Sequence, residues 1–148
     1  MIFSKRSRYG LRALIDLAQY ESNESIQLNE IAERNSVSVK YLEQIFAALR
    51  KAGIIGSIKG PQGGYYLARP SGSITVAEIV IALDGIYFLD REEVSDKGKG
   101  EAAAHAVQTK IIDPLNEWID HFLNTLTLKE LVECSEKYSD AFQNMYYI

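Results

Sequence analysis

Apolar residues recur at helical spacing at the start of the chain. A helix beginning at Ser7 is predicted from one apolar face. That face consists of Leu11, Leu14, Ile15 and Ala18. The next apolar segment, residues 28–35, predicts a short second helix that Asn35 can end.

A third apolar stripe follows almost at once and predicts a helix-turn-helix. Ser38 is a good N-cap and Gly53 a good C-terminal stop for a helix between them. Two helices separated by so tight a turn form a helix-turn-helix. The side chains expected on the exposed face of the second helix suit hydrogen bonds to base edges and phosphates. They are Lys40, Tyr41, Glu43, Gln44 and Arg50.

Two short runs with strand composition follow, residues 54–59 and 65–69, and the connection between them is rich in glycine. A five-residue, glycine-containing connection predicts a β-hairpin, which Pro70 would end. The glycines lack the spacing and the following helix of a phosphate-binding loop. Two interpretations stay open. The hairpin is either a DNA-contacting wing with Lys59 at its base and Gln62 at its tip, or an ordinary surface hairpin.

The remaining pattern is helical, with one polar interruption. A capping box, Thr75 with Glu78, begins a helix that Gly85 ends, and residues 90–100 are polar and without periodicity. A long helix is then predicted from an apolar seam, with Pro114 expected to kink or locally break it. The seam comprises Ala104, Val107, Ile111, Leu115, Trp118 and Phe122.

A second capping box, Thr127 with Glu130, precedes the end of the chain, "YSDAFQNMYYI". This aromatic tail, with Phe142, Tyr146 and Tyr147, is expected to fold back on the domain.

Charge is distributed unevenly along the 148 residues. Residues 1–80 contain ten Lys and Arg against seven Asp and Glu, and residues 81–148 contain six against thirteen. Four cations, Lys5, Arg6, Arg8 and Arg12, cluster near the start of the first helix, where the macrodipole disfavours them. They therefore indicate an anionic partner, such as nucleic acid. No apolar run is long enough to span a bilayer and no secretion signal is evident, so a cytoplasmic protein is expected.

Four linked motifs carry a resemblance to a known family: "RYGLRAL…LA", "IAERNSVSVKYLEQIFAALRKAGII", "SIKGPQGGYYLARP" and "ITVAEIVIALDG". In order and spacing they resemble the Rrf-two family of bacterial winged-helix transcriptional regulators. The resemblance implies a mainly α fold with a small β-hairpin: a winged helix-turn-helix plus a long C-terminal dimerisation helix. It assigns residues 1–85 to DNA binding, 86–100 to a flexible loop, and 101–148 to the dimerisation helix and tail.

The resemblance also implies the function, a homodimeric repressor that binds double-stranded DNA at a pseudo-palindromic operator. DNA contacts would come from the first-helix arm, the recognition helix and the wing. Those residues are Lys5, Arg8, Ser38, Lys40, Tyr41, Glu43, Gln44, Lys59 and Gln62. The implied dimer interface consists of Val107, Ile111, Leu115, Trp118 and Phe122.

In one respect the chain departs from the family. Iron-sulfur relatives carry three closely spaced cysteines in the loop after the fourth helix, and residues 90–100 contain none. Since a cluster needs several thiolates, no cofactor is expected. The single cysteine, Cys134, lies among glutamates that disfavour a reactive thiolate. His105 and His121, with Glu117, are interpreted as helix-surface residues rather than a metal site, and no enzyme active site is predicted.

The missing cysteines and the closing Tyr147-Ile148 resemble the cluster-free regulators of cysteine metabolism within this family. That resemblance implies that the free C-terminal isoleucine binds in the active site of O-acetylserine sulfhydrylase. Two alternatives stay open: an adaptor that binds a metabolic enzyme through this tail without binding DNA, and, more distantly, a metal-dependent enzyme.

Overall fold

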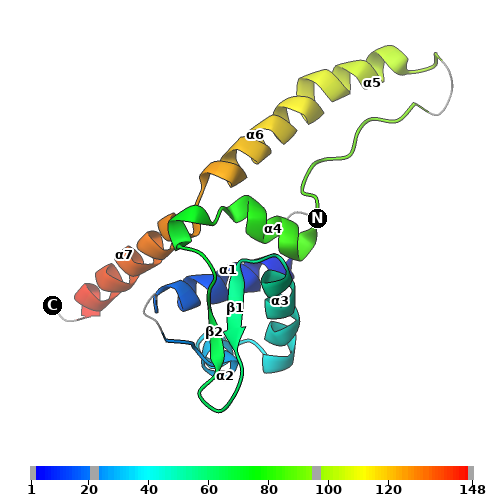
Figure 1. Ribbon diagram of the computed structural model, residues 1–148. Helices are drawn as coiled ribbons and strands as arrows, with labels where there is room; N and C mark the ends of the chain where they lie inside the picture. Colours follow the sequence, from blue (N-terminus) through cyan, green and yellow to red (C-terminus); the bar gives the residue numbers. More distant parts are fainter. Residues whose placement is uncertain (1–2, 21–23, 95–97, 147–148) are drawn as a thin grey trace.

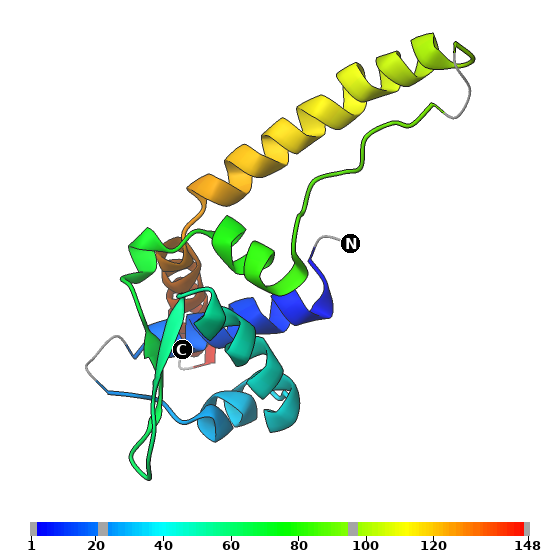
Figure 2. The same cartoon turned by 45° about the vertical axis from the view of Figure 1, so that its right-hand side comes forward.

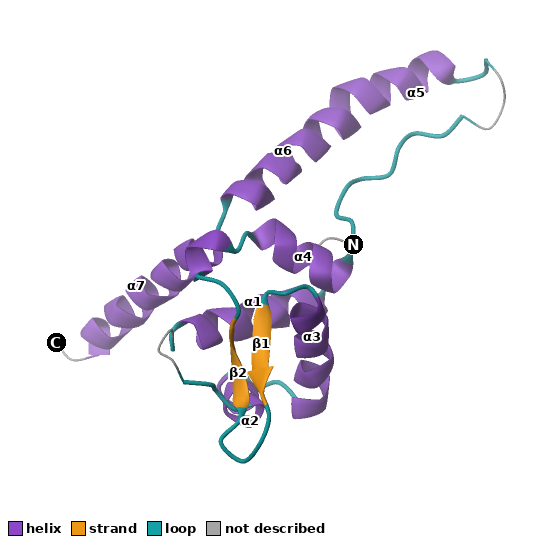
Figure 3. Cartoon of the chain, in the orientation of Figure 1, coloured by secondary structure: helices purple, strands orange, loops and turns teal. Residues whose placement is uncertain are grey.

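The computed structural model describes residues 3–20, 24–94 and 98–146. Figure 3 shows that its described part is almost entirely helical, with one small two-stranded sheet. The predicted fold class, a winged helix-turn-helix with a long C-terminal helix, is confirmed. None of the helices in the described ranges is long and apolar enough to cross a membrane.

Three helices form the N-terminal bundle: α1 (Lys5–Ala18), α2 (Leu28–Arg34) and α3 (Val39–Lys51). Ser4 caps α1, so this helix begins two residues before the predicted Ser7. Ser38 caps α3 as predicted, because its hydroxyl accepts a hydrogen bond from the Tyr41 N–H at 3.2 Å. The turn between α2 and α3 is closed by Ser36, whose backbone is left-handed with a φ of 53°.

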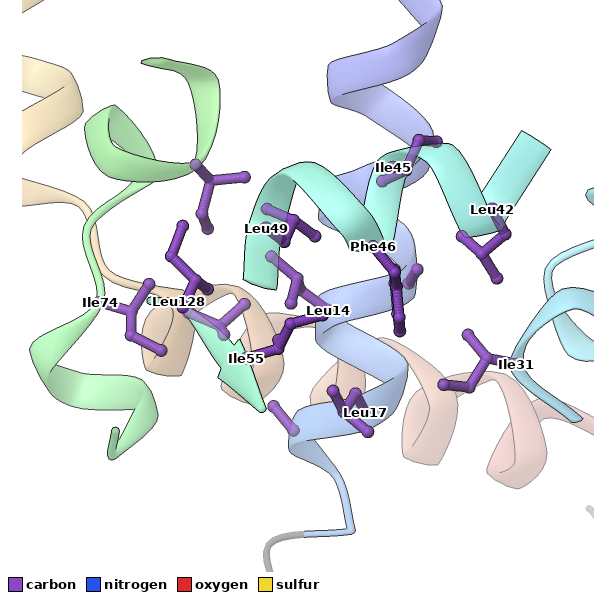
Figure 4. Packing of buried hydrophobic residues seen from close by; sticks show 14 of the residues in the cluster. Leu14, Leu17, Ile31, Leu42, Ile45, Phe46, Leu49, Ile55, Ile74 and Leu128 are labelled. Atoms are coloured by element: carbon purple, nitrogen blue, oxygen red, sulfur yellow. The ribbon is translucent and has the colours of Figure 1, made fainter. Parts of the chain in front are cut away.

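The main core lies where α1, α2 and α3 meet the sheet (Figure 4). Phe46 and Leu49 of α3 pack with Leu14 of α1, and none of the three is exposed to solvent. Burial of each such side chain contributes about 1.5–3 kcal/mol to the free energy of unfolding. The predicted apolar faces of α1 and α3 are therefore the core faces.

A hairpin of β1 (Ile55–Ile58) and β2 (Gly64–Leu67) pairs antiparallel and extends beyond the bundle (Figure 1). Gly64 belongs to β2, so the connection is residues 59–63. Ile26 adds a bridge to the hairpin: its N–H donates to the Tyr65 carbonyl at 2.9 Å and its carbonyl accepts from the Tyr65 N–H at 2.8 Å.

After the short turn η1 (Ser71–Ser73), the predicted Thr75–Glu78 capping box begins α4 (Val76–Asp84), and Gly85 ends it with a φ of 83°. The extended segment 86–94 then leads to a long helix that projects away from the bundle (Figure 2).

The long helix consists of α5 (Glu101–Val107), a π-helical segment η2 (Gln108–Ile112) and α6 (Asp113–Thr125). The predicted disturbance at Pro114 takes the form of this π-helical segment, because proline has no N–H to donate and sits within the first turn of α6. The helix therefore continues past Pro114 and is not broken there.

The last helix, α7 (Leu128–Tyr146), returns to the bundle. Its predicted capping box is present, since Glu130 accepts from the Thr127 N–H at 2.9 Å. Leu128 and Val132 join the main core beside α1. The prediction that Phe142 and Tyr146 fold back is wrong: both are exposed on the far end of α7, which extends past the bundle. Tyr147, the third tail aromatic, lies outside the described residues.

Candidate DNA-binding surface

The hairpin tip and the start of α3 lie at the same end of the molecule, opposite the long helix (Figures 1 and 2). On α3, Lys40, Glu43 and Gln44 are exposed, as are Lys59 and Gln62 at the hairpin connection. A helix and a hairpin that project from one end can engage adjacent grooves or the backbone of one duplex.

Ser38 and Tyr41, two of the predicted contact residues at the start of α3, also have structural contacts. The exposed Ser38 uses its hydroxyl to cap α3. Tyr41, expected to be exposed, is half-buried, and its ring meets the Tyr9 ring edge-on with centroids 6.0 Å apart. Helical periodicity places Tyr41 at the edge of the apolar stripe, where a large ring reaches back to α1.

The start of α1 presents fewer free cations than the sequence predicts. Lys5 and Arg8 are exposed, and the Arg8 Nε donates to the Phe3 carbonyl at 3.1 Å. Arg6 has its Nε buried, and Arg12 donates to the Asn35 carbonyl at 3.0 Å. Lys5 and Arg8 are therefore the members of this cluster best placed to meet phosphate.

Two further arginines of the bundle have structural partners. Arg34 forms an ion pair with Asp16 at 2.6 Å, and the hydrogen bond to Asp16 raises the pKa of the guanidinium. Arg50, expected on the DNA-facing side of α3, donates to the Ser57 hydroxyl of β1 at 3.1 Å. Arg50 thereby joins the recognition helix to the hairpin.

The long helix carries an unusually apolar exposed face. Trp118 is 63% exposed and Ile111 is 52% exposed. Val107, Leu115 and Phe122, the other predicted interface residues, are also exposed. A contiguous apolar face of this kind on a projecting helix indicates a protein interface.

The opposite face of the same helix holds the segment that follows α4, which sequence reasoning did not find. Asn116 binds both backbone groups of Leu89, accepting from its N–H at 2.7 Å and donating to its carbonyl at 3.2 Å. Eight residues before Asn116, the Gln108 side chain accepts a hydrogen bond from the Glu92 N–H at 2.8 Å. The π-helical turn brings Gln108 within 2.6 Å of Asp113, five residues on.

Tyr87 anchors the start of that segment. Its hydroxyl donates to Asp120 at 2.7 Å and accepts from Asn124 at 3.2 Å, while its ring is buried beside Leu123. Burial, followed by the Asp120 hydrogen bond, raises the pKa of the Tyr87 hydroxyl. The segment that follows α4 is therefore fixed to α6 through a partly buried polar contact.

The donor set of this segment does not fit a cysteine-ligated iron-sulfur cluster. A cleft between the segment and α5 is lined by Arg91, Glu92, Glu101 and His105 among others, with no thiol. Cys134, the single cysteine of the chain, is exposed on α7. His105 and His121 are both exposed, and among the described residues no group of three His, Cys, Asp or Glu could hold a metal ion.

Comparison with known proteins gives a consistent result. Residues 3–134 match the family model Rrf2, described as "Iron-dependent Transcriptional regulator". The chain is 35% identical to the HTH-type transcriptional regulator IscR of Klebsiella pneumoniae over 136 residues, which is 92% of this chain and 82% of that protein.

Two solved structures are similar over nearly the whole chain. The structure of T. potens IscR superposes with a TM-score of 0.74 at 33% identity, covering 99% of this chain and 97% of that one. CymR (YrzC), the global cysteine regulator of B. subtilis, superposes with a TM-score of 0.71 at 30% identity, covering 90% and 97%.

Proposed function

The chain belongs to the Rrf2 family of helix-turn-helix, DNA-binding transcriptional regulators, and from that premise we propose that it acts as a homodimeric repressor on a pseudo-palindromic operator. Membership of this family makes it a regulator and not an enzyme. A chromosomal operator as target implies that it works in the bacterial cytoplasm.

The observation that carries the homodimer proposal is the exposed apolar face of the long helix. Two copies that bury this face against each other form an isologous interface with two-fold symmetry. Such a dimer presents two recognition helices, and these would enter major grooves about 34–36 Å apart, or a multiple of that spacing. Operator half-sites are then inverted repeats.

Within each half-site, the exposed chemistry of the described residues supports a division of roles. Lys40, Glu43 and Gln44 on α3 read base edges, with Ser38 and Tyr41 shaping the start of the helix. Phosphates are contacted by Lys5 and Arg8 of α1 and by Lys59 of the hairpin, and Gln62 at the hairpin tip contacts the adjacent groove. The hairpin is then a DNA-contacting wing.

We also propose that the protein binds DNA without an iron-sulfur cluster. The support is the ligand chemistry, since one thiol per chain cannot replace the several thiolates that such a cluster requires. Protein purified without oxygen is expected to be colourless and to bind its operator without added iron. Stoichiometric visible absorption from iron and sulfide would contradict this.

Control of cysteine metabolism is proposed from the similarity to the global cysteine regulator of B. subtilis. In this proposal the last residues, Tyr147 and Ile148, bind O-acetylserine sulfhydrylase. The exposed end of α7, with Tyr138, Phe142 and Tyr146, supports an accessible position for that tail.

Binding to a short duplex tests the function. Genomic footprinting with the purified protein would identify an operator, which is then synthesised as intact and half-site duplexes. The intact duplex should bind two chains with an affinity that falls steeply as salt rises, since phosphate contacts release counterions. An adaptor without DNA-binding activity would instead give no footprint and equally weak binding to every duplex.

A further inference from the structure

Asp84, at the end of α4, is bonded to the first residue before α1, eighty positions earlier in the chain. The Ser4 N–H donates to Asp84 Oδ2 at 3.0 Å, and the Ser4 hydroxyl donates to Asp84 Oδ1. Figures 1 and 2 show the start of α1 beside the end of α4. The carboxylate also lies at the positive end of the α1 dipole, where negative charge is favoured.

Ser4 in turn fixes the geometry at the start of α1. Its hydroxyl oxygen caps the helix by accepting from the Ser7 N–H at 3.2 Å. The preceding residue, Phe3, has a φ of 59°, a left-handed conformation that a bulky residue adopts only when its surroundings impose it. Its ring packs against the cluster formed by α4 and α6.

The strained residue is the one that orients Arg8. The Arg8 Nε donates to the Phe3 carbonyl at 3.1 Å, so the direction of that carbonyl sets where the guanidinium points. Asp84 holds Ser4, Ser4 holds the adjacent Phe3, and Phe3 directs Arg8. Asp84 itself is half-buried and makes no direct contact with the predicted DNA surface among the interactions of the described residues.

The carboxylate is held in its ionised form by these contacts. Burial alone would raise the pKa of Asp84, but the hydrogen bonds from the Ser4 hydroxyl and the Ser4 N–H outweigh it and lower the pKa. The Ser4 N–H and the Ser4 hydroxyl donate to different oxygens of the carboxylate. A side-chain amide has only one acceptor oxygen, so it cannot accept both of these bonds in this arrangement.

We propose that Asp84 is a positioning residue for DNA binding, acting through Ser4 and Phe3 to hold Arg8 toward the phosphate backbone. This inference rests on the proposed Arg8–phosphate contact. If the proposal holds, the end of α4 influences a DNA contact made by Arg8 of α1, a different helix.

The sign of the effect separates positioning from simple electrostatics. Replacing Asp84 by asparagine removes a negative charge from beside the basic start of α1, so electrostatics alone predicts tighter DNA binding. Positioning predicts weaker binding, because Arg8 is no longer directed to its phosphate.

A double-mutant cycle on the full-length protein tests the coupling. Asp84→Asn and Arg8→Ala should each weaken operator binding by about a hundredfold, which corresponds to one charge-assisted contact of about 1.4 kcal/mol in each of the two protomers. The double variant should bind no more weakly than Arg8→Ala alone, because both changes remove the same contact. Each single variant should lower the log-log salt slope by about two units, one for the Arg8 contact of each protomer.

A matched control separates capping from DNA binding. Glu130→Gln neutralises a carboxylate that accepts from the Thr127 N–H and hydroxyl in the same way, but at α7. It should leave operator affinity unchanged. Ser4→Ala keeps the Asp84 charge and should reproduce part of the affinity loss, which covers the case in which Asp84→Asn unfolds.

Additive losses in the cycle, or tighter binding by a folded Asp84→Asn variant, would overturn the positioning role while leaving Arg8 as a DNA contact. If Arg8→Ala binds the operator as tightly as the unchanged protein, the Arg8 contact and its positioning both fail. The homodimer and its operator would stand in either case.

Discussion

The rings of Trp118 and Phe122 stack on the exposed face of α6, with centroids 5.2 Å apart and planes only 8° from parallel. Each ring leaves about half or more of its surface in solvent, with Trp118 63% and Phe122 45% exposed. Two aromatic rings fixed against each other and still exposed would form a rigid anchor in the proposed dimer interface.

The first prediction concerns this anchor and its neighbour one to two turns earlier. Replacing Ile111 and Trp118 together by glutamate should give monomers, because like charges would meet across the two-fold axis in a desolvated interface. Sedimentation velocity measures the change directly. Glu117→Arg, at an exposed polar position beside Trp118, should remain dimeric, and a dimer that survives both glutamates would rule this face out.

Much of the fold was predictable because its signals are local. Capping boxes at Thr75 and Thr127, the stop at Gly85 and the apolar stripes depend on neighbours within one or two turns of a helix. The prediction for the tail failed because it followed the aromatic composition, which suggests burial in the core. No proline or glycine interrupts the helix between Thr127 and Tyr146, so α7 continues past the bundle instead.

The second prediction tests the wing through its charge. Lys59→Ala should flatten the dependence of operator affinity on salt by about two units of log-log slope, if Lys59 of each protomer contacts one phosphate. Affinity for random duplex should fall by a similar factor, since phosphates carry no sequence. Lys137→Ala, at an exposed position midway along α7, is the control and should leave the slope unchanged. If the slope for Lys59→Ala is unaltered, the hairpin does not contact DNA through Lys59, and the interpretation as an ordinary surface hairpin is favoured.

The third prediction concerns base reading by α3. Gln44→Ala should reduce preference for the operator over variants changed at one position, by roughly 1–3 kcal/mol if the amide makes a bidentate contact with a base. Binding to random duplex should barely change. Competition titrations against a set of single-base variants would measure this, with Gln143→Ala as control. Equal losses on operator and random DNA would remove Gln44 from the residues that read sequence.

The fourth prediction tests why the wing is rich in glycine. A Cβ on Gly64 would lie 2.5 Å from the Ile26 carbonyl oxygen, closer than any real contact, so the backbone of the bridge would have to move. Gly64→Ala should therefore lower the free energy of unfolding by about 1–3 kcal/mol. Gly72→Ala, whose Cβ would meet only Lys129 at 3.5 Å, should change it little. Chemical denaturation of both variants distinguishes them.

The candidate DNA-binding surface was less predictable than the fold because it depends on contacts between residues distant in sequence. Which residues of α3 are exposed followed largely from periodicity, except that Tyr41 reaches Tyr9. Ser4 is hydrogen-bonded to Asp84, and the Asn116 side chain is hydrogen-bonded to the Leu89 backbone. Each of these pairs joins residues that are far apart in the sequence and of types that are common on any protein surface. Polar pairs of this kind leave no periodic signal.

The last prediction concerns the tail beyond the described residues. A free carboxylate on an apolar terminal residue is a compact ligand that backbone amides can hold while its side chain fills a pocket. Deleting Tyr147 and Ile148 should abolish binding to the O-acetylserine sulfhydrylase of the same organism, measured by titration calorimetry, and should leave dimerisation and operator affinity unchanged. Phe142→Ala, five residues before the first deleted residue and on the exposed end of α7, is the control for a general loss of apolar surface. Binding that persists after the deletion, or no binding by the intact chain, would exclude the tail as the ligand.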